Sequence, residues 1–476
     1  VWARHAPGGL RGWPPWRVGA ADEQSVYLLE RGYLVACARQ DGRLRWRSEA
    51  PLGWARELAL GHDLVVHAGT ARLSARDAGQ GGERWQLALD PAELDPGDGF
   101  QHLVATPGGF VASLRRAGRW EVWGVGPEGK PRWKTTLWDA GPEVTQGLRW
   151  DLERPHVKPA TAARRVLSDG RLAALADAVA LTIEGRVLLL GAELGEIRWA
   201  RERLVGVGLG GRGPVRVALR LGAWGVEALT AHGLFVRLDP ASGRDLALPP
   251  IPHHEGKPTR GYLFSSDPPL VGWAAPQGLR LVSAGGSFAQ DLEVAPSWRG
   301  AALGDLLALP AGDELSWRPL AAGAAAPPLR WPLGPARLQP VPGGLLLLST
   351  EGAALVERSA PGETAPAGFP SSLAEQVGAL GARSWRLRHA AWEALADRLS
   401  KDPAAERSAW QALTPLRGAR QLEASWSLGA LIARARVQRL WTQVFPTLPW
   451  SQLEAATSDP SGAALRALAP QVAATP

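Results

Sequence analysis

The sequence predicts a mainly β fold, an eight-bladed β-propeller, followed by a small α-helical domain. The first observation behind this prediction is a five-residue pattern of glycine, two free positions, arginine and tryptophan. It occurs four times in the first 200 residues, at 42–46, 81–85, 129–133 and 195–199. The second observation is that each copy follows a short apolar run, a glycine, a second run and a polar turn. Repeats of about 40–50 residues with several short strands each are typical of a propeller.

The apolar runs read as strands because they are short and are bounded by glycine and aspartate, as in residues 25–41. The first glycine of a unit predicts a hairpin turn, and the second predicts the next turn, because tight turns often need positive φ. The tryptophan then falls in the third strand of its unit. Its ring is expected to be buried against a neighbouring blade. The residues given this inter-blade role are Trp46, Trp85, Trp133, Trp199 and Trp331.

The arginine before each tryptophan is expected on the opposite face of the strand, because side chains alternate along a strand. That face is predicted to be solvated. The four arginines are Arg45, Arg84, Arg132 and Arg198.

Four degenerate copies follow the complete ones, and the first of them keeps the hairpin but has Ala247 in place of the tryptophan. They lie at 224–248, 269–294, 304–333 and 343–366. This gives eight units in about 350 residues, although the pattern leaves seven and eight blades both open.

These repeats resemble the PQQ-like β-propeller family, whose blades carry an aspartate, a glycine and a tryptophan at fixed spacing. Asp77, Gly81 and Trp85 match that pattern, and "LDPASGR" (238–244) is similar to its turn. "WPPWR" (13–17) also resembles an opening found at the mature start of many bacterial members. The resemblance covers roughly residues 10–368, and it predicts the fold much more strongly than an activity.

The resemblance implies two very different functions, because the family includes quinoprotein dehydrogenases and the propeller lipoprotein of the outer-membrane protein assembly machinery. In the enzymes a quinone and a Ca²⁺ ion are held by Glu, Asn and Asp, and many members add adjacent cysteines. This chain has no Asn and only one cysteine, Cys37. We therefore expect no bound cofactor or metal and no enzymatic activity, and we assign no catalytic residue.

A long segment at about 138–168 interrupts the repeat spacing, because the third and fourth motif tryptophans are 66 residues apart while the earlier steps are 39 and 48. Long loops in compact domains often carry function. Tryptophan and arginine are favoured at interface centres. The predicted partner contacts are Trp138, Arg149, Trp150 and Arg154, and the alternative is a disordered insertion.

Composition changes after Pro370, so we divide the chain into a propeller (1–370) and a helical domain (371–476) with a flexible tail. Apolar residues on one face predict a helix at 384–399, with Trp385, Trp392, Leu395 and Leu399 inside. Asp402 is expected to cap the next helix, with Pro403 at its first position. The paired helices resemble HEAT-type α-hairpins.

Charge and composition exclude several classes of function. The net charge of +7 is mild for 476 residues and the arginines are scattered, so no nucleic-acid partner is expected. The sequence contains no run of about 18 apolar residues, so no membrane-spanning helix is expected. Peripheral association with a membrane stays open. A single cysteine excludes an intrachain disulfide, and Cys37 is expected to be buried.

Two local motifs are interpreted as structural. The pair His253 and His254 with Glu255 is expected in a solvated loop, because neighbouring residues rarely bind one ion. The glycine-rich stretch 206–213 lacks the Lys-Ser/Thr of a nucleotide loop and is expected to be a turn.

The sequence thus favours a non-enzymatic scaffold for protein partners in a larger assembly of a bacterial cell envelope. The start at Val1, with no Met and no leader, is interpreted as a removed signal peptide or a missing start. The expected location is therefore the periplasm or the extracellular space. The alternatives are a carbohydrate- or ligand-binding propeller and a diverged quinoprotein-like enzyme.

Overall fold

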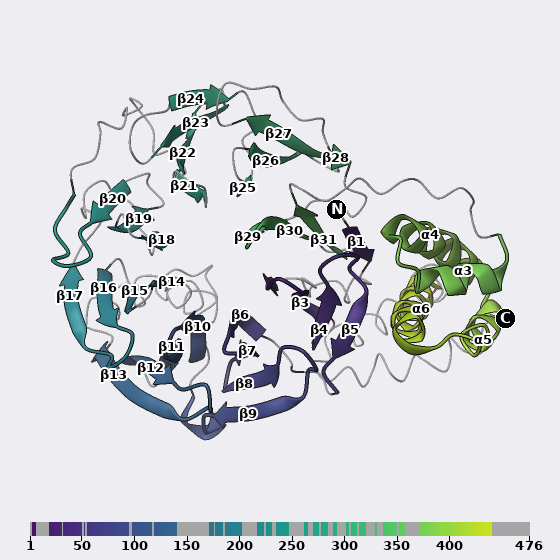
Figure 1. Ribbon diagram of the computed structural model, residues 1–476, viewed down its shortest axis with the longest axis horizontal. Helices are drawn as coiled ribbons and strands as arrows, with labels where there is room; N and C mark the ends of the chain where they lie inside the picture. Colours follow the sequence, from purple (N-terminus) through teal and green to yellow (C-terminus); the bar gives the residue numbers. More distant parts are fainter. Residues whose placement is uncertain are drawn as a thin grey trace, which may run out of the picture. The chain divides into compact units, whose positions relative to one another are not determined.

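The computed structural model is mainly β in the first three quarters of the chain and helical after residue 371 (Figure 1). The residues that it describes are 2–5, 19–30, 32–49, 52, 55–94, 98–116, 119–139, 171–175, 177–183, 186–201, 217–222, 225–230, 235–246, 261–264, 270–275, 278–283, 289–292, 301–303, 306–311, 314–319, 329–330, 337–349, 352–357 and 371–439.

The strands form antiparallel sheets, which we number in chain order. Sheet 1 holds β2 (Gly19–Ala21), β3 (Ser25–Glu30), β4 (Tyr33–Ala38) and β5 (Leu44–Arg47). Sheet 2 holds β6 (Ala55–Gly61), β7 (Leu64–Gly69), β8 (Arg72–Asp77) and β9 (Glu83–Ala88). Sheet 3 holds β10 (Gly99–Thr106), β11 (Gly109–Arg116), β12 (Arg119–Val125) and β13 (Pro131–Asp139), and a short 3-10 helix, η1 (Pro91–Glu93), precedes it. Sheet 4 holds β14 (Arg171–Leu175), β15 (Ala178–Ile183), β16 (Arg186–Gly191) and β17 (Ile197–Arg201).

The later sheets repeat the arrangement. Sheet 5 has three described strands, β18 (Val217–Gly222), β19 (Gly225–Thr230) and β20 (Phe235–Leu238). Sheet 6 holds β21 (Gly261–Phe264), β22 (Leu270–Ala275), β23 (Gly278–Ser283) and β24 (Ala289–Leu292). Sheet 7 holds β25 (Ala301–Leu303), β26 (Leu306–Ala311), β27 (Glu314–Pro319) and β28 (Leu329–Arg330). Sheet 8 holds β29 (Arg337–Val341), β30 (Gly344–Leu348), β31 (Gly352–Glu357) and, as its last strand, β1 (Trp2–His5).

The motif tryptophans lie in the fourth strand of each sheet, so the sequence-based placement in a third strand is wrong. Trp46, for example, is in β5, the last strand of sheet 1. In sheet 1 the strand that the pattern missed is the first one, β2, which is only three residues long. A strand this short shows too little alternation to be recognised in a sequence.

The chain divides into two compact units. The larger unit comprises residues 17–36 and 46–346, and the smaller one comprises residues 1–16, 37–45 and 347–476. The helices therefore group with the end of sheet 8 and with a turn of sheet 1. The division proposed at residue 370 stays a prediction.

Inside the larger unit, the first strands of neighbouring sheets contact one another in chain order. Contacts join β2 to β6, β6 to β10, β10 to β14, β14 to β18, and β18 to β21. Strand β29 contacts both β25 and β2, and Gln339 of β29 accepts a hydrogen bond from the Gly19 N–H at 3.3 Å. The first and last sheets of the series are therefore neighbours within this unit.

Apolar residues from the two facing sides of neighbouring sheets make the core of the larger unit. Between sheets 2 and 3, Val66 and Leu73 meet Phe110 and Leu114. The alternation of the strands places odd and even residues on opposite sides, so each sheet contributes to two such clusters. Because both faces are covered, these strands are apolar almost throughout, as in β7, where every residue is buried.

The described helices are α3 (Leu373–Leu380), α4 (Trp385–Lys401), α5 (Ala405–Gln411) and α6 (Gly418–Arg439). The start of α3 is fixed by a capping box between Ser372 and Glu375. Helix α4 begins after Ser384, whose side chain accepts the Leu387 N–H at 3.2 Å. No described helix is long and apolar enough to cross a membrane.

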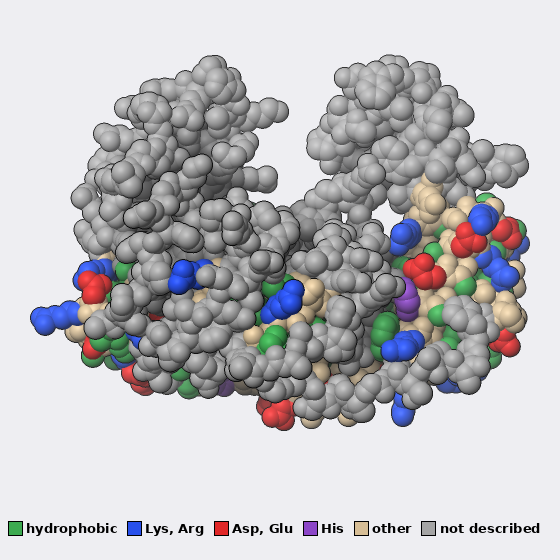
Figure 2. Space-filling model, turned by 90° about the horizontal axis from the view of Figure 1, so that it is seen from above, with side chains coloured by type: hydrophobic (Ala, Val, Ile, Leu, Met, Phe, Trp, Pro, Cys, Tyr) green, Lys and Arg blue, Asp and Glu red, His purple; other side chains and the backbone are tan. Residues whose placement is uncertain are grey.

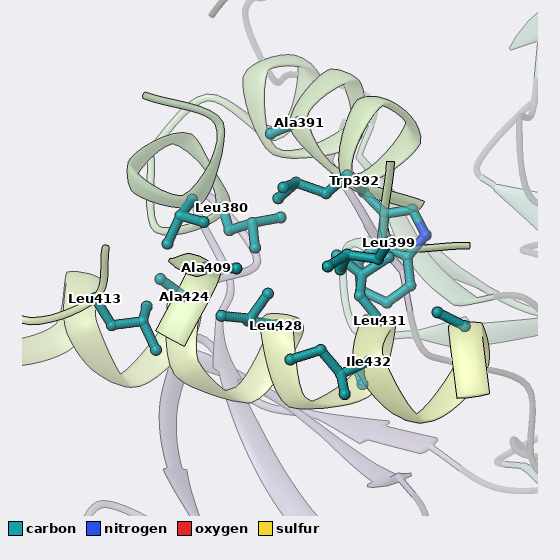
Figure 3. Close-up of a cluster of buried hydrophobic side chains, with 14 of the residues drawn as sticks. Leu380, Ala391, Trp392, Leu399, Ala409, Leu413, Ala424, Leu428, Leu431 and Ile432 are labelled. Carbon is teal, nitrogen blue, oxygen red and sulfur yellow. The ribbon is translucent and has the colours of Figure 1, made fainter. Parts of the chain in front are cut away.

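The helices share one apolar core. Figure 3 shows Trp392 and Leu399 of α4 turned toward Leu428 and Leu431 of α6. Trp392, Leu395 and Leu399 are buried, but Trp385 is only half-buried, and the guanidinium of Arg386 lies 5.7 Å from the centre of its ring.

The expected cap of α5 differs from the structure. Helix α5 begins at Ala405, so Pro403 is not its first residue, and Asp402 ends α4 instead. The Asp402 carboxylate accepts the Ala404 N–H at 2.9 Å, which stabilises the turn between the two helices.

Candidate functional site

The tryptophan of each complete motif packs on the glycine of the next sheet's motif. A Cβ added to Gly81 would lie 2.5 Å from the ring of Trp46, so only glycine leaves room for the indole. Gly81 also has φ of +77°, a conformation that glycine adopts without strain. The same contact joins Trp85 to Gly129, Trp133 to Gly195 and Trp199 to Gly243.

Each indole N–H also donates a hydrogen bond to the turn that holds the glycine. The Nε1 distances are 2.9 Å to Ala78 O from Trp46, 2.7 Å to Pro127 O from Trp85, 3.2 Å to Ala192 O from Trp133 and 2.9 Å to Pro240 O from Trp199. The recurrence of glycine and tryptophan in the sequence thus corresponds to a contact between consecutive sheets, with one partner in each.

Burial of the four motif tryptophans is uneven. Trp46 is 7% exposed, but Trp85, Trp133 and Trp199 are half-buried rather than enclosed. The prediction that all of these rings are buried is wrong for the last three. Trp331 lies outside the described residues.

The arginine of the motif is exposed for a different reason from the one expected. In sheet 2, Ala75 pairs with Trp85 and Arg76 pairs with Glu83, so Arg84 is an extra residue. The same irregularity leaves Arg132 and Arg198 extra in sheets 3 and 4. A β-bulge at this position turns the arginine outward. Its partners are then local carboxylates, such as Asp77, which Arg84 contacts at 2.6 Å.

A tryptophan that sequence reasoning missed has the motif register in sheet 8. Trp2 of β1 pairs with Leu355, the fourth residue of β31. In the same way Trp199 pairs with Leu189, the fourth residue of β16. The sequence signal was weak, because Trp2 stands at the opposite end of the chain from the sheet that it completes.

The segment predicted to bind a partner is almost entirely outside the described residues. Only its first two positions are placed, at the end of β13, where Trp138 pairs with Trp120 of β12. Arg149, Trp150 and Arg154 lie outside the described residues, as do His253, His254 and the glycine-rich stretch 206–213. Their assigned roles stay predictions.

A carboxylate and a histidine meet on the first strands of sheets 2 and 3. Glu57 Oε1 lies 2.8 Å from His102 Nδ1, and Glu57 Oε2 accepts the Leu103 N–H at 2.7 Å. In β6 a bulge with Arg56 as the extra residue comes just before Glu57. In β10 a bulge with Gln101 as the extra residue comes just before His102. Bulges often re-aim side chains near functional sites. A carboxylate on Nδ1 fixes the orientation of the imidazole.

Metal-binding potential is limited in the part of the chain that the structure describes. Within those ranges, no group of three or more His, Cys, Asp or Glu side chains could hold a metal ion. Cys37, the single cysteine of the chain, is buried.

In the smaller unit, the helices bind the turn of the first motif. The Glu423 carboxylate of α6 accepts the Leu44 N–H at 2.6 Å, and it also accepts the Ser427 hydroxyl at 3.2 Å. Arg388 of α4 donates to the carbonyl of Asp41, and its other nitrogen donates to Ala382 O and Arg383 O at 2.8 Å each. Glu423 is 1% exposed and Leu44 is 1% exposed, so this contact is buried.

The charged side chains that are visible on the face drawn in Figure 2 show both signs among the described residues. Basic residues are more frequent on the helices. The exposed basic side chains there are Arg383, Arg386, Arg398, Lys401, Arg407, Arg417, Arg420, Arg434 and Arg436, and the exposed acidic ones are Glu375, Glu393, Asp397 and Asp402.

No protein-family model matches the chain, and no curated protein matches its sequence. In structure it is similar to BamB from Moraxella catarrhalis, with a TM-score of 0.51 and 13% identity over 74% of this chain and 98% of BamB. It is equally similar to the computationally designed Ika8 protein, with a TM-score of 0.51 and 14% identity over 74% of this chain and all of that one.

A quinohemoprotein alcohol dehydrogenase, ADHIIG from Pseudomonas putida HK5, has a TM-score of 0.48 and 12% identity, covering 93% of this chain and 92% of its own. The similarity to BamB confirms the PQQ-like propeller fold: the chain is mainly β, with sheets like propeller blades and four described C-terminal helices. At this level of identity a likeness shows the fold alone.

Proposed function

We propose that the chain is an eight-bladed propeller that acts as a non-enzymatic scaffold for protein partners in a bacterial cell-envelope assembly. The observation that carries this proposal is the buried contact between the helices and the turn of the first motif. Here a turn of the repeat binds a helical segment through main-chain groups. The turns of sheets 2, 4 and 5 keep both main-chain groups at the corresponding positions, whereas sheet 3 keeps only the carbonyl, because Pro131 has no N–H.

The geometry of that contact explains why it suits recognition. Leu44 N–H and Asp41 C=O are main-chain groups, so their positions depend on the turn and not on the side chains around it. In the sheets that keep both main-chain groups, sequence changes in the turn can alter specificity without altering the binding geometry. Arg388 donates to the Asp41 carbonyl, and Glu423 accepts from the Leu44 N–H. Both bonds are charge-assisted, and such a hydrogen bond is roughly twice as strong as a neutral one.

The proposal can be tested by photo-crosslinking in the native organism. A photoreactive residue would replace Gln80, Glu128 or Ser242, which are exposed and directly precede the motif glycine of sheets 2, 3 and 5. Thr70, exposed in the β7–β8 connection at the opposite end of sheet 2, serves as the control. We expect discrete adducts from at least one turn and none from Thr70. Equal labelling from all positions would contradict a scaffold role for the turns.

A second candidate function, ligand binding, is favoured by the pair of Glu57 and His102. Its geometry leaves an oriented imidazole at the first strands, and such a group can act as a base or bind a ligand. Quinone and Ca²⁺ titration of the purified chain, followed by absorbance and dye reduction, tests the enzyme version. Saturable binding that is lost in His102→Gln, with substrate-dependent dye reduction, would replace the scaffold proposal.

A further inference from the structure

Three of the four exposed large apolar side chains in the described part of the chain belong to sheet 4. They are Leu175 at 41% exposure, Leu194 at 73% and Ile197 at 44%. Leu175 ends β14 at the β14–β15 hairpin, while Leu194 and Ile197 flank the turn between β16 and β17. The two turns lie at the same end of the sheet, because the Ala192 N–H donates to Asp177 O at 2.8 Å.

Leu194 and Ile197 occupy the turn positions whose counterparts in sheet 1 bind the helices. Counted from the motif glycine, Leu194 corresponds to Asp41 and Ile197 corresponds to Leu44. In sheet 1, Leu44 is covered and its N–H binds Glu423 of α6. The corresponding pairs in the other complete or near-complete motifs are polar or proline-containing: Gln80 and Glu83, Glu128 and Pro131, and Ser242 and Asp245. Sheet 4 thus has an apolar version of the helix-binding turn, and both of its apolar side chains are exposed.

The rim of this apolar surface is acidic. In the two turns, Asp177, Glu193 and Glu196 are exposed, and so is the cation Arg198. Arg198 already pairs with Asp177 at 2.8 Å and with Glu196 at 3.3 Å. Its hydrogen bond and positive charge hold the pKa of Asp177 below the usual range, so this carboxylate stays ionised. Within the described residues of these two turns, three carboxylates and one guanidinium give a net charge of −2, which favours a basic partner.

The fourth exposed large apolar side chain is Trp410 of α5, at 45% exposure. Arg407 lies three residues before it, one turn along the same exposed face of the helix. The opposite face of α5 is buried through Ala405 and Ala409. Helix α5 thus presents an indole beside a guanidinium, on a set of helices that carries nine exposed basic residues and four exposed acidic ones.

We infer that the turn of sheet 4 is a docking site for the α5 face of a second copy of this chain. The apolar side chains Leu194 and Ile197 would cover Trp410, and the acidic rim would face Arg407. Tryptophan and arginine are the residues most favoured at the centre of an interface. The surfaces on the two copies differ, so the contact is heterologous and joins copies head to tail. The inference rests on the proposed scaffold function, because it uses the same binding of a helix to a repeat turn.

The test is the association state of the full chain, measured by sedimentation equilibrium from 1 to 200 µM, a range chosen for interfaces at the small end of the size scale. We expect concentration-dependent association that weakens at least tenfold in Leu194→Ser and in Trp410→Ser. Gln80→Ser, at the corresponding position of sheet 2, should associate like the wild type. High salt should weaken the association, because rim charges are screened.

A mixture of the two variants gives the sharpest test. Each variant lacks one half of the contact, so neither should associate alone. Together, the sheet 4 of the Trp410→Ser chain can bind the α5 of the Leu194→Ser chain, which yields one-to-one dimers and nothing larger.

A wild-type chain that stays monomeric at 200 µM would overturn the inference, as would association that survives either substitution. Monomeric wild type with turn-specific adducts in cells would overturn self-association alone and leave the scaffold proposal standing.

Discussion

The repeated sheets and the helices are stabilised in two different ways. In sheets 1 to 4, one tryptophan–glycine contact recurs between each sheet and the next, and each contact is local. The helices instead share a single cluster around Trp392, Leu395, Leu428 and Leu431. A series of similar contacts distributes stability among neighbours, whereas one shared core concentrates it. A substitution should therefore be felt more strongly in the helices than at any one contact of the repeats.

The largest effect should come from Trp392→Ala. Trp392 is 2% exposed at the centre of the helical core, so the substitution loses a large apolar contact and leaves a cavity. We expect a loss of about 3–5 kcal/mol in the free energy of unfolding of the helices. Hydrogen exchange of α3 to α6 followed by mass spectrometry measures this locally. Unchanged protection in the helices would show that the core is less cooperative than we argue, and Trp410→Ala, at an exposed site, is the matched control.

The second prediction concerns how the stability of the packing between sheets 1 and 2 depends on pH. His67 of β7 is fully buried, two residues from Val65, which belongs to the cluster shared by these two sheets. Burial, and then the positive charges of Arg72 and Arg76, lower its pKa from 6.5 to about 4. Between these values the unfolded chain binds the proton and the folded chain does not. The contribution of neutral His67 is therefore complete above pH 6.5, is lost as the pH falls, and is gone near pH 4.

Integrated over that window, the loss is about 3 kcal/mol. We expect the unfolding midpoint in denaturant to fall between pH 6.5 and pH 4, and His67→Gln to remove most of that slope. A slope of the same size in the variant would assign the acid sensitivity to other groups.

The third prediction compares two adjacent glycines. Gly81 has φ of +77° and an added Cβ would meet the ring of Trp46 at 2.5 Å, while Gly82 has nothing within 4 Å of such a Cβ. Gly81→Ala should therefore destabilise the chain by about 2 kcal/mol, from backbone strain and displacement of the indole. Gly82→Ala should change stability by less than about 0.5 kcal/mol in either direction. Thermal unfolding of both variants decides this, and equal shifts would contradict the proposed contact.

The repeat pattern predicted more of the structure than of the site. The turn at the motif glycine and the packing of the motif tryptophan between sheets could be predicted, because these two residues recur at a fixed spacing in the sequence. The first strand of sheet 1 could not, because β2 has three residues and no visible alternation. The bulge at Arg84 was missed as well, since the addition of one residue to a strand changes pairing without changing composition.

The binding surfaces were still harder to foresee. Glu57 and His102 lie 45 residues apart, and only the packing of two sheets brings them to 2.8 Å. Glu423 and Leu44 are 379 residues apart. Neither pair leaves a local signal in the sequence. The prediction for Trp138, Arg149, Trp150 and Arg154 relied on composition alone, and it remains a prediction.

The smallest effect separates the hydrogen bond of the contact from its apolar part. In Trp85→Phe an aromatic ring still covers Gly129, but the N–H that donates to Pro127 O at 2.7 Å is lost. Trp85 is half-buried, so water can partly replace this donor. We expect a loss of about 1 kcal/mol, the net value of one such bond.

Trp133→Phe offers the internal comparison, because its bond to Ala192 O is longer, at 3.2 Å, and should contribute less. Chemical unfolding of both variants, followed by far-ultraviolet circular dichroism, measures the difference. If Trp133→Phe cost more than Trp85→Phe, the ring and not the N–H would determine the strength of the contact. The stability of each step in the series would then depend on how closely the indole covers its glycine.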